Sequence, residues 1–461
     1  MKKRILSLIL VLAMCLSLIA CGASEPETTP TQNTPVTNSP VTNSPAAGGT
    51  TQEDAADAPE GEVDPNFLDD AELPETLANP NISIVYWYNE TQYTYDTSKN
   101  PNVYDPILEA IPYFEEKYGG EVKIIYAAWG DMLSTVTALQ QAGEAPDLFE
   151  VYDEVFYSTV LAGVCQPIDD YTTDKDFSYF NVDKSLFSWK GSTYAVPLKP
   201  FVFHIFFNKD LFDLEGMTYP DELYLNGEWT WDAFRDICKT MTKTVDGETV
   251  QLGYGSWQDT ILAFMYANGT TFLNTDTANG TVTSNLGDPK VQNTLNYMIE
   301  LKDTMVFGSE LYDWFDNGKM AMVRAHDFPV DFPFEVGVVP FPTGDDAEGK
   351  NLVVFPQGMA VPTGAKNPEG AMAFMRIVCE LQLELGDKRE AARIGQENYD
   401  LIYADDVTPV YAYDKSLHDI NYVIACITNY ISDGVPAATI YANMEAELQS
   451  ELDLMFAPPT E

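Results

Sequence analysis

Basic side chains are scarce in this sequence. Its 461 residues include 25 lysine and arginine residues against 71 aspartate and glutamate residues, which gives a formal net charge of −46. Nucleic-acid-binding proteins need basic patches, so we expect no nucleic-acid partner. An exterior of this sign is typical of a well-solvated protein and defines no particular ligand.

The signatures of common catalytic and metal sites are also missing. The chain has three histidines, His204, His326 and His418, and no HExxH, GxSxG, P-loop or GxGxxG motif. With 71 acidic residues, no single pair of catalytic carboxylates stands out. We therefore predict no catalytic residue, no metal site and no cofactor.

Cysteine is used sparingly, and none of the six cysteines forms a CxxC pair. This excludes zinc-ribbon and thioredoxin-type sites. Cys165, Cys238, Cys379 and Cys426 are widely spaced within apolar patterns, which favours buried free thiols. A disulfide is the open alternative, because spacing alone does not decide pairing.

Long apolar runs are confined to the N-terminus. Basic residues 2–4 precede an uncharged run, residues 5–20, which is shorter than the roughly 20 residues that span a bilayer. This pattern predicts a signal peptide over residues 1–20. Its ending, Leu-Ile-Ala-Cys21, resembles the lipobox of bacterial lipoproteins, which implies lipidation of Cys21. We expect an extracytoplasmic protein on the outer face of the cell membrane, touching the membrane through this anchor only.

A spacer follows the cysteine. Residues 21–78 are rich in Pro, Thr, Ser, Asn and acidic residues, and the pentapeptide Val-Thr-Asn-Ser-Pro repeats directly at 36–40 and 41–45. Such a segment cannot bury enough apolar surface to offset the entropy lost on ordering. We predict a disordered tether. The alternative to a lipoprotein is a plain secretory signal with a chance cysteine.

The first part of the body alternates between strands and helices. Apolar runs at 82–87, 122–126 and 145–151 read as strands, and helical spacing separates them at 104–117 and 132–142. This order predicts a parallel α/β sheet. The carboxyl ends of its strands would then meet at one edge, where ligands bind in such sheets.

The rest of the body is mainly helical, with strands returning in two places. We predict helices at 229–234, 258–266, 288–302, 419–431 and 438–454, and strands at 194–199, 336–339 and 357–362. Such a return suggests two lobes that the chain crosses between more than once.

Aromatic residues gather where the first three strands end. Tyr88, Trp129 and Asp153 follow these strands, and Trp87 is the last residue of the first. Aromatic faces beside polar groups suit sugars, because a ring stacks on the C–H face while polar groups bond the hydroxyls. We predict Tyr88, Trp129 and Asp153 as ligand-binding residues, and core packing remains as plausible for Trp87.

Four segments then resemble the extracellular solute-binding proteins, family 1, that serve bacterial ABC importers for sugars. They are Ala-Pro-Asp-Leu-Phe-Glu-Val at 145–151, the series from Tyr-Ala-Val-Pro at 194–197 through Asn-Lys-Asp-Leu-Phe at 208–212 to Thr-Trp-Asp-Ala-Phe at 230–234, Phe-Asp-Asn-Gly-Lys-Met-Ala-Met at 315–322, and Gly-Met-Ala-Val-Pro-Thr-Gly at 358–364. The resemblance implies an α/β, two-lobe periplasmic-binding-protein-like fold (type II) with hinge crossings and an interlobe ligand cleft. We place lobe 1 at 79–198 and 322–375, and lobe 2, mostly helical, at 199–321 and 376–461.

The same resemblance implies further ligand contacts. Gly-Tyr-Gly-Ser-Trp257 resembles a glycine-rich turn whose aromatic residue faces the cleft, and Lys199 lies near a lobe crossing. The segment after Gly318 would reach the cleft with Arg324, Asp327 and Phe328. Family members often have a Gly-x-Trp-like turn there, and this chain has Ala-His-Asp-Phe instead.

The resemblance implies a function as well. It predicts the substrate-binding lipoprotein of an ABC importer, a monomer that captures a carbohydrate, an oligosaccharide in the first instance, and delivers it to the permease's transmembrane subunits by hinge closure. Two alternatives stay open: a lipoprotein enzyme acting on extracellular glycans, and a binding module that presents its ligand to a sensor kinase. Polyamines, peptides and organic anions are alternative solutes for this fold.

Overall fold

The described part of the chain lies within one compact unit, residues 57–461. In the computed structural model it comprises residues 63–64, 66–69, 71–99, 103–180, 184–308, 311–325, 332–404, 406–411, 414 and 420–456. The predicted signal peptide 1–20, the lipidation site Cys21, and the predicted contacts Asp327 and Phe328 lie outside these residues. Within them, no helix combines the length and apolarity that crossing a bilayer requires.

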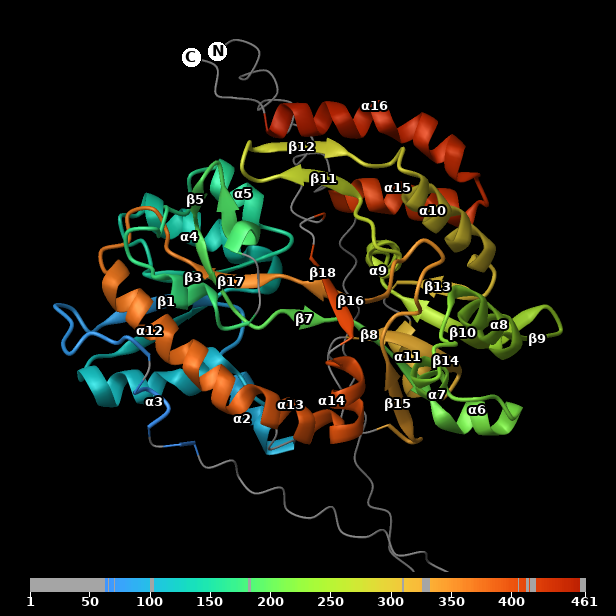
Figure 1. The fold of residues 1–461 in the computed structure, drawn as a ribbon, viewed down its shortest axis with the longest axis horizontal. Coiled ribbons are helices and arrows are strands. Elements are labelled where there is room, and N and C mark those ends of the chain that lie inside the picture. The colour runs from blue at the N-terminus through green and yellow to red at the C-terminus, as the bar shows by residue number, and fades with distance from the viewer. Residues whose placement is uncertain are drawn as a thin grey trace, which may run out of the picture. The chain divides into compact units, whose positions relative to one another are not determined.

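The first lobe is built on a five-stranded sheet (Figure 1). Its strands run in the order β2 (Val122–Tyr126), β1 (Ile82–Tyr86), β3 (Leu148–Tyr152), β17 (Gln357–Ala360) and β6 (Ala195–Pro197). Strands β2 and β3 pair with β1 in parallel, as the alternation of strands and helices predicts, whereas β17 is antiparallel to β3. The helices of this lobe are α2 (Glu90–Lys99), α3 (Pro106–Tyr118), α4 (Met132–Gln141), α5 (Phe156–Leu161) and α12 (Pro368–Leu381).

Helix α3 shows how local sequence sets an element of this lobe. Asp105 caps its first turn by accepting a hydrogen bond from the Leu108 N–H, and Pro106 occupies the first helical position, where its missing N–H costs nothing. The helix ends at Gly119, whose φ of 71° suits a residue without Cβ. Helix α3 packs on α12 through Phe114 and Phe374, with ring centroids 5.6 Å apart.

The second lobe has its own mixed sheet. Strands β13 (Met305–Phe307), β10 (Glu248–Ser256), β14 (Met320–Ala325), β8 (His204–Asn208) and β15 (Val336–Val339) follow one another, and β9 (Lys243–Val245) pairs with β10. Its helices are α6 (Lys209–Glu215), α7 (Pro220–Leu225), α8 (Trp231–Met241), α9 (Thr260–Ala267), α10 (Pro289–Leu301) and α11 (Leu311–Asp316). Thr230 caps α8 through its side chain, in agreement with the helix start predicted there.

Smaller elements complete the fold. A three-stranded sheet of β18 (Val407–Tyr411), β16 (Lys350–Phe355) and β7 (Phe201–Val202) lies between the two larger sheets in Figure 1. Two hairpins, β4–β5 (Ser188–Trp189 and Ser192–Thr193) and β11–β12 (Leu273–Asp276 and Thr281–Ser284), are separate from it. The C-terminal helices are α13 (Asp387–Ile394), α14 (Gln396–Ile402), α15 (Ile420–Ser432) and α16 (Ala437–Met455), and a π-helical turn, Gln382–Gly386, joins α12 to α13.

Two boundaries differ from the sequence-based division. Residues 322–375 were assigned to the first lobe, but β14 and β15 pair within the second sheet, and β17 and α12 belong with the first. Strand β14 is apolar in sequence, which fits either sheet, and only its long-range pairing with β8 and β10 decides between them. The second difference concerns the segment predicted as a tether, residues 21–78, because residues near its end pack on the first lobe.

The end of that segment packs on the first lobe. The ring of Phe67 meets Tyr113 edge-on at 5.1 Å, Ala71 is fully buried, and the Tyr118 hydroxyl donates to the Pro74 carbonyl at 2.9 Å. These few apolar residues sit within a polar composition, so the overall composition of the segment conceals them.

Within the part of the chain that the structure describes, three segments cross between the large sheets. Residues 198–200 lead from β6 toward β7 and β8, and residues 355–357 lead from β16 to β17. The third crossing runs from α12 through the π-helical turn to α13 and α14, which packs near β15. The prediction of more than one crossing is therefore correct.

Candidate functional site

A cavity of about 1200 Å³ is lined by residues from both large sheets and from all three crossings. The first sheet contributes the residues that follow β1, β2 and β3, because parallel strands bring their carboxyl ends to one edge. The second lobe contributes the turn after β10 and the end of β14. The predicted convergence of these segments at one edge is what the fold shows.

A continuous aromatic wall covers the first-lobe side of the cavity; we define it as Trp87, Tyr88, Trp129 and Tyr152. Trp87 stacks on Tyr88 with centroids 5.1 Å apart, and meets Trp129 edge-on at 5.7 Å. Trp129 stacks on Tyr152 at 4.0 Å with an interplanar angle of 25°. Each ring thus supports the next, and the half-buried Trp87 and Trp129 offer faces suited to a flat apolar surface.

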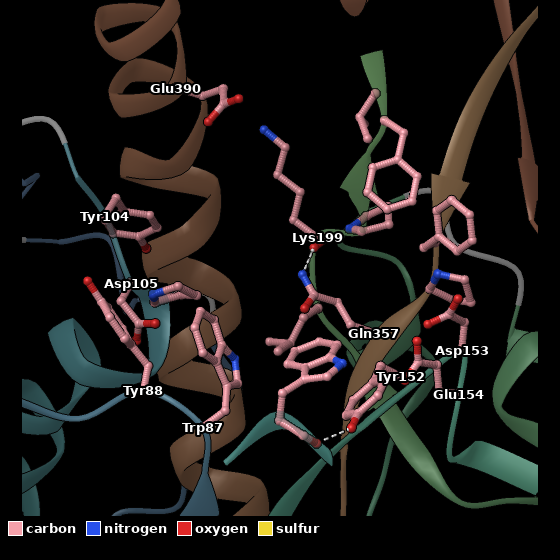
Figure 2. Close-up of a pocket in the computed structure, with 18 of the residues that line it drawn as sticks. Trp87, Tyr88, Tyr104, Asp105, Tyr152, Asp153, Glu154, Lys199, Gln357 and Glu390 are labelled. Atoms are coloured by element: carbon pink, nitrogen blue, oxygen red, sulfur yellow. Dashed lines mark hydrogen bonds between the residues drawn. The ribbon is translucent and has the colours of Figure 1, made fainter. Parts of the chain in front are cut away.

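Internal hydrogen bonds fix the orientation of the two tyrosines. The Tyr88 hydroxyl donates to Asp96 of α2, and the Tyr152 hydroxyl donates to the Trp129 carbonyl (Figure 2). Because both hydroxyls are engaged within the protein and both side chains are buried, the two tyrosines hold Trp87 and Trp129 in place from behind. The Trp87 Nε1 is buried and has no hydrogen-bond partner among the described residues.

Two acids of the first lobe, Asp105 and Glu150, are buried. Asp105, which caps α3, also accepts a hydrogen bond from the Tyr86 hydroxyl at 2.9 Å, and burial raises the pKa of its carboxyl to about 6. Glu150 in β3 is fully buried with no hydrogen-bond partner among the described residues, and burial together with the charge of Asp105 raises its pKa well above the usual value. Asp105 lines the cavity, and Glu150 lies in the interior of the first sheet.

Asp153 and Glu154 form the turn that leaves β3. Asp153 is 4% exposed and Glu154 is half-buried, and both line the cavity. Figure 2 shows them beside Tyr152, with Tyr88 and Asp105 on the other side of Trp87. Carboxyl groups therefore lie at both ends of the aromatic wall.

Arg324 is the main polar group from the second lobe. Its side chain is 5% exposed, pairs with Asp259 at 2.9 Å, and donates from Nε to the Ser256 hydroxyl at 3.0 Å. Its guanidinium lies over the Phe203 ring, 4.3 Å from the centroid. The Nη1 group is buried and has no hydrogen-bond partner among the described residues, so it is a donor held in place at the cavity.

Trp257 follows β10 and is 40% exposed at the cavity. It lies in the glycine-rich turn whose aromatic residue was predicted to face a cleft. Several other aromatic residues are as exposed, so what marks Trp257 as a candidate contact is its place in the lining of the cavity.

Lys199 ties the three crossings together. Its Nζ pairs with Asp387 of α13 at 2.6 Å and lies 4.7 Å from the centroid of the Tyr403 ring. The backbone N–H of Lys199 donates to the Gln382 side chain at 3.2 Å. The backbone carbonyl of Lys199 accepts a hydrogen bond from the Gln357 side chain at 2.7 Å (Figure 2). Lys199 lines the cavity, but its charge is already engaged with the protein.

The six predicted contacts within the described residues all line this one cavity: Tyr88, Trp129, Asp153, Lys199, Trp257 and Arg324. Sequence reasoning missed Tyr152, Glu154 and Asp259, although each neighbours a predicted residue or pairs with one. It also missed Gln382, Glu390 and Arg393, which come from the C-terminal helical segment. No local motif marks those three, because the fold alone brings that segment to the cavity.

Nothing in the described residues forms a metal site: no group of three or more His, Cys, Asp or Glu side chains is placed to hold an ion. Cys165, Cys238, Cys379 and Cys426 are free thiols, the first three of them buried. Burial raises the pKa of the Cys165 thiol to about 12, which makes it unreactive at neutral pH.

Known proteins resemble this chain at two levels. A binding protein of Brucella abortus is 27% identical over 183 residues, which is 37% of this chain and 42% of the length of that protein. The aligned region therefore spans less than half of the curated relative. Two solved structures share the fold over most of their length.

The first is an ABC substrate-binding protein of Listeria monocytogenes in complex with cycloalternan; it is 18% identical, covers 82% of this chain and 99% of its own, and has a TM-score of 0.60. The second is UgpB of Mycobacterium tuberculosis in complex with glycerophosphocholine, at 16% identity, 81% and 98% coverage and a TM-score of 0.61. At these identities the likeness establishes the fold. The model of the bacterial extracellular solute-binding proteins matches residues 97–378, more than half of the chain, and the protein belongs to that family, family 1.

Proposed function

We propose that this protein captures an oligosaccharide outside the cell and delivers it to the permease of an ABC importer by closing its two lobes. The observation that carries the proposal is the aromatic wall at the carboxyl edge of the first sheet. Sugar rings have apolar C–H faces that stack on aromatic rings, while their hydroxyls bond polar groups at the rim. Asp153, Gln357 and Arg324 line the same cavity and would serve the hydroxyls.

The size of the cavity supports an oligomer rather than a single sugar. Its volume of about 1200 Å³ exceeds the range of about 300–1000 Å³ that is common for small-molecule sites. The complex of the Listeria protein with cycloalternan supports a saccharide in this fold. The complex of UgpB with glycerophosphocholine shows that the fold also serves other solutes, so our argument rests on the wall and not on the fold.

Closure would follow from contacts made on both lobes. The wall and Asp153 belong to the first lobe, and Trp257 and Arg324 belong to the second. A solute shifts the equilibrium toward a closed form only if it binds that form more tightly, and a solute touching both sides does so. Motion about a few crossing segments is a hinge closure.

The decisive experiment is a thermal-shift screen of residues 57–461 against mono- and oligosaccharides, amines and peptides. A ligand at 100 times its Kd adds about 2.7 kcal/mol to the free energy of unfolding, which raises the melting temperature measurably. Stabilisation by one saccharide class that is lost in Trp129→Ala supports the proposal. The absence of a shift with every saccharide contradicts it, and conversion of the bound sugar to product would favour the glycan-acting enzyme.

Anchoring and delivery need experiments in cells. We propose that Cys21 carries the lipid and holds the protein at the outer face of the membrane, where the permease lies. Replacing Cys21 with Ala should move the protein from the membrane fraction to the medium and reduce uptake of the solute. Retention of Cys21→Ala in the membrane fraction would contradict lipid anchoring.

A further inference from the structure

We infer that the cavity selects saccharides that bear a protonated amino group, and rejects saccharides that bear a carboxylate. This inference rests on the proposed function and names the class of its substrate. It comes from the charges that surround the aromatic wall.

Among the described residues, every basic side chain that lines the cavity is held in an ion pair with an acidic side chain of the protein. These pairs are Lys199 with Asp387 at 2.6 Å, Arg324 with Asp259 at 2.9 Å, and Arg393 with Glu390 at 2.9 Å. An anionic ligand would have to compete with these carboxylates for each cation. The cost is greatest at Arg324, which is 5% exposed and has little access to water.

In the part of the lining that the structure describes, acidic side chains outnumber basic ones. Beyond Asp259 and Glu390, the lining includes four more carboxyl groups: Asp96, Asp105, Asp153 and Glu154. Figure 2 shows Asp105 at one end of the wall, and Asp153 with Glu154 at the other. Carboxyl groups near both ends of the wall favour a cationic ligand group over a carboxylate there.

The wall itself favours cations. The faces of tryptophan and tyrosine attract a cation through the ring quadrupole. The hydroxyls of Tyr88 and Tyr152 are engaged with Asp96 and the Trp129 carbonyl, and the accessible faces of the wall are those of Trp87 and Trp129. Aromatic faces with carboxyl groups at both ends form a site for an ammonium group attached to an apolar ring.

Arg324 does not oppose this assignment. Its charge is matched by Asp259, and its Nη1 donor can bond a neutral hydroxyl or ether oxygen as well as a carboxylate. An amino sugar supplies such oxygens beside its ammonium group. The formal charge of −46 on the whole chain also repels anions. At physiological salt this repulsion decays over a distance of about 8 Å.

The test is calorimetric titration of the purified protein with four β-1,4-linked trisaccharides at neutral pH and low salt, with spermidine as a sugar-free amine. The trisaccharides are those of glucosamine, N-acetylglucosamine, glucose and glucuronic acid. We expect the glucosamine oligomer to bind at least tenfold more tightly than its N-acetyl and glucose counterparts, and the glucuronic acid oligomer not to bind. The difference should shrink as salt is raised.

Other outcomes overturn the inference in distinguishable ways. Equal affinity for the amino and neutral oligomers, or binding of the glucuronic acid oligomer, overturns the amine preference and leaves the proposed saccharide function standing. Tight binding of spermidine with no binding of any saccharide overturns the saccharide class here and the proposed function together. Absence of binding by all five ligands also overturns the inference.

Three variants locate the selectivity. Asp153→Asn with Glu154→Gln should cut the preference for the amino oligomer several-fold while changing affinity for the neutral oligomer less. Glu116→Gln with Glu144→Gln removes the same charge from exposed positions of the first lobe and should leave the preference intact. Asp387→Asn, at an exposed partner of Lys199, should raise affinity for the glucuronic acid oligomer. Equal loss in both double variants would show that only total charge matters, and would overturn the assignment to this site.

Discussion

The indole of Trp129 lies flat against the ring of Tyr152, 4.0 Å away, and its backbone carbonyl accepts the tyrosine's hydroxyl hydrogen bond. Trp129 begins a short 3-10 helix, Trp129–Asp131, in the segment after β2, and Tyr152 ends β3. The pair therefore joins the ends of two strands that are not adjacent in the sheet and gives the aromatic wall its rigid centre.

Replacing Trp129 with Ala should weaken saccharide binding at least tenfold and change stability little. Trp129 is half-buried, so its removal exposes the Tyr152 face but opens no closed cavity in the core. Calorimetric titration beside a thermal melt measures both effects. Trp129→Phe keeps an aromatic face and should recover part of the affinity for the saccharide. Equal affinity in the Ala and Phe variants would show that stacking on this residue does not contribute to binding.

Trp257 offers a cleaner separation of binding from folding. Because it is 40% exposed, Trp257→Ala should leave the melting temperature of the ligand-free protein within about 1 °C of the parent. We expect affinity to fall severalfold, since the second lobe would lose its aromatic contact. Unchanged affinity for every saccharide bound by the parent protein would remove Trp257 from the site.

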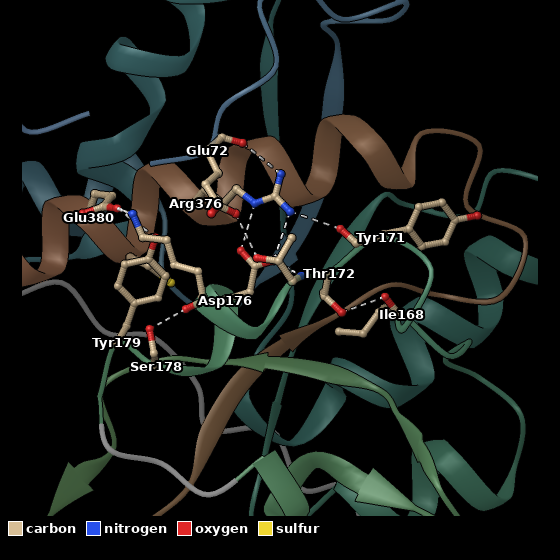
Figure 3. Close-up of polar contacts among 12 residues, drawn as sticks. Glu72, Ile168, Tyr171, Thr172, Asp176, Ser178, Tyr179, Arg376 and Glu380 are labelled. Carbon is tan, nitrogen blue, oxygen red and sulfur yellow. Dashed lines mark hydrogen bonds and ion pairs between the residues drawn. The ribbon is translucent and has the colours of Figure 1, made fainter. Parts of the chain in front are cut away.

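The first lobe is held together far from the cavity by Arg376. Its guanidinium makes two hydrogen bonds to Asp176, at 2.9 and 3.0 Å, and also donates to the carbonyls of Glu72 and Tyr171 (Figure 3). Arg376→Ala leaves the Asp176 carboxylate, 4% exposed, without its counter-charge. We expect a loss of about 3 to 5 kcal/mol in the free energy of unfolding, measured by urea denaturation.

The control for this variant is Lys388→Ala. Lys388 pairs with Glu384 one helical turn away, and its side chain is 58% exposed. A pair of this kind contributes only about 0.3 to 0.5 kcal/mol. Similar losses in both variants would contradict a special role for the buried pair, and a changed ligand affinity in Arg376→Ala would contradict its remoteness from the site.

Asp414 should make stability depend on pH. Burial raises the pKa of its carboxyl to about 7, even though Tyr266 and the N–H groups of Phe272 and Leu273 donate to it. Since the folded state holds this proton more tightly than the unfolded state, Asp414 stabilises the fold below pH 4 and loses that contribution as pH rises toward 7. The slope is at most about 1.4 kcal/mol per pH unit.

Asp414→Asn isolates this contribution. The amide does not titrate, so urea denaturation at pH 4 to 8 should show the variant gaining on the parent protein as pH rises. The amide also loses one of the acceptor oxygens, which lowers its stability by a constant amount at every pH. A difference between the two proteins that stays constant from pH 4 to 8 would show that Asp414 does not titrate in this range.

Much of the first lobe could be predicted from the sequence because its signals are local. Asp105 and Pro106 open α3 and Gly119 closes it, and the strands β1, β2 and β3 each stand out as short apolar runs. Parallel pairing then follows from the helices between them, and places Tyr88, Trp129 and Asp153 at one edge. The order of the strands was therefore enough to predict that these three residues lie together.

The tertiary structure decided what depends on contacts far apart in the chain. Lys199 pairs with Asp387, 188 positions away. This residue, predicted to contact the solute, therefore lines the cavity and also links two of the crossings. Strand β14 joined the second sheet because of its partners and not its composition. By itself the sequence determined the local elements and the edge at which they meet, since capping and periodicity act over a few residues. The charge balance of the cavity was decided by the folded chain alone, because each ion pair that sets it forms only when the segments are brought together.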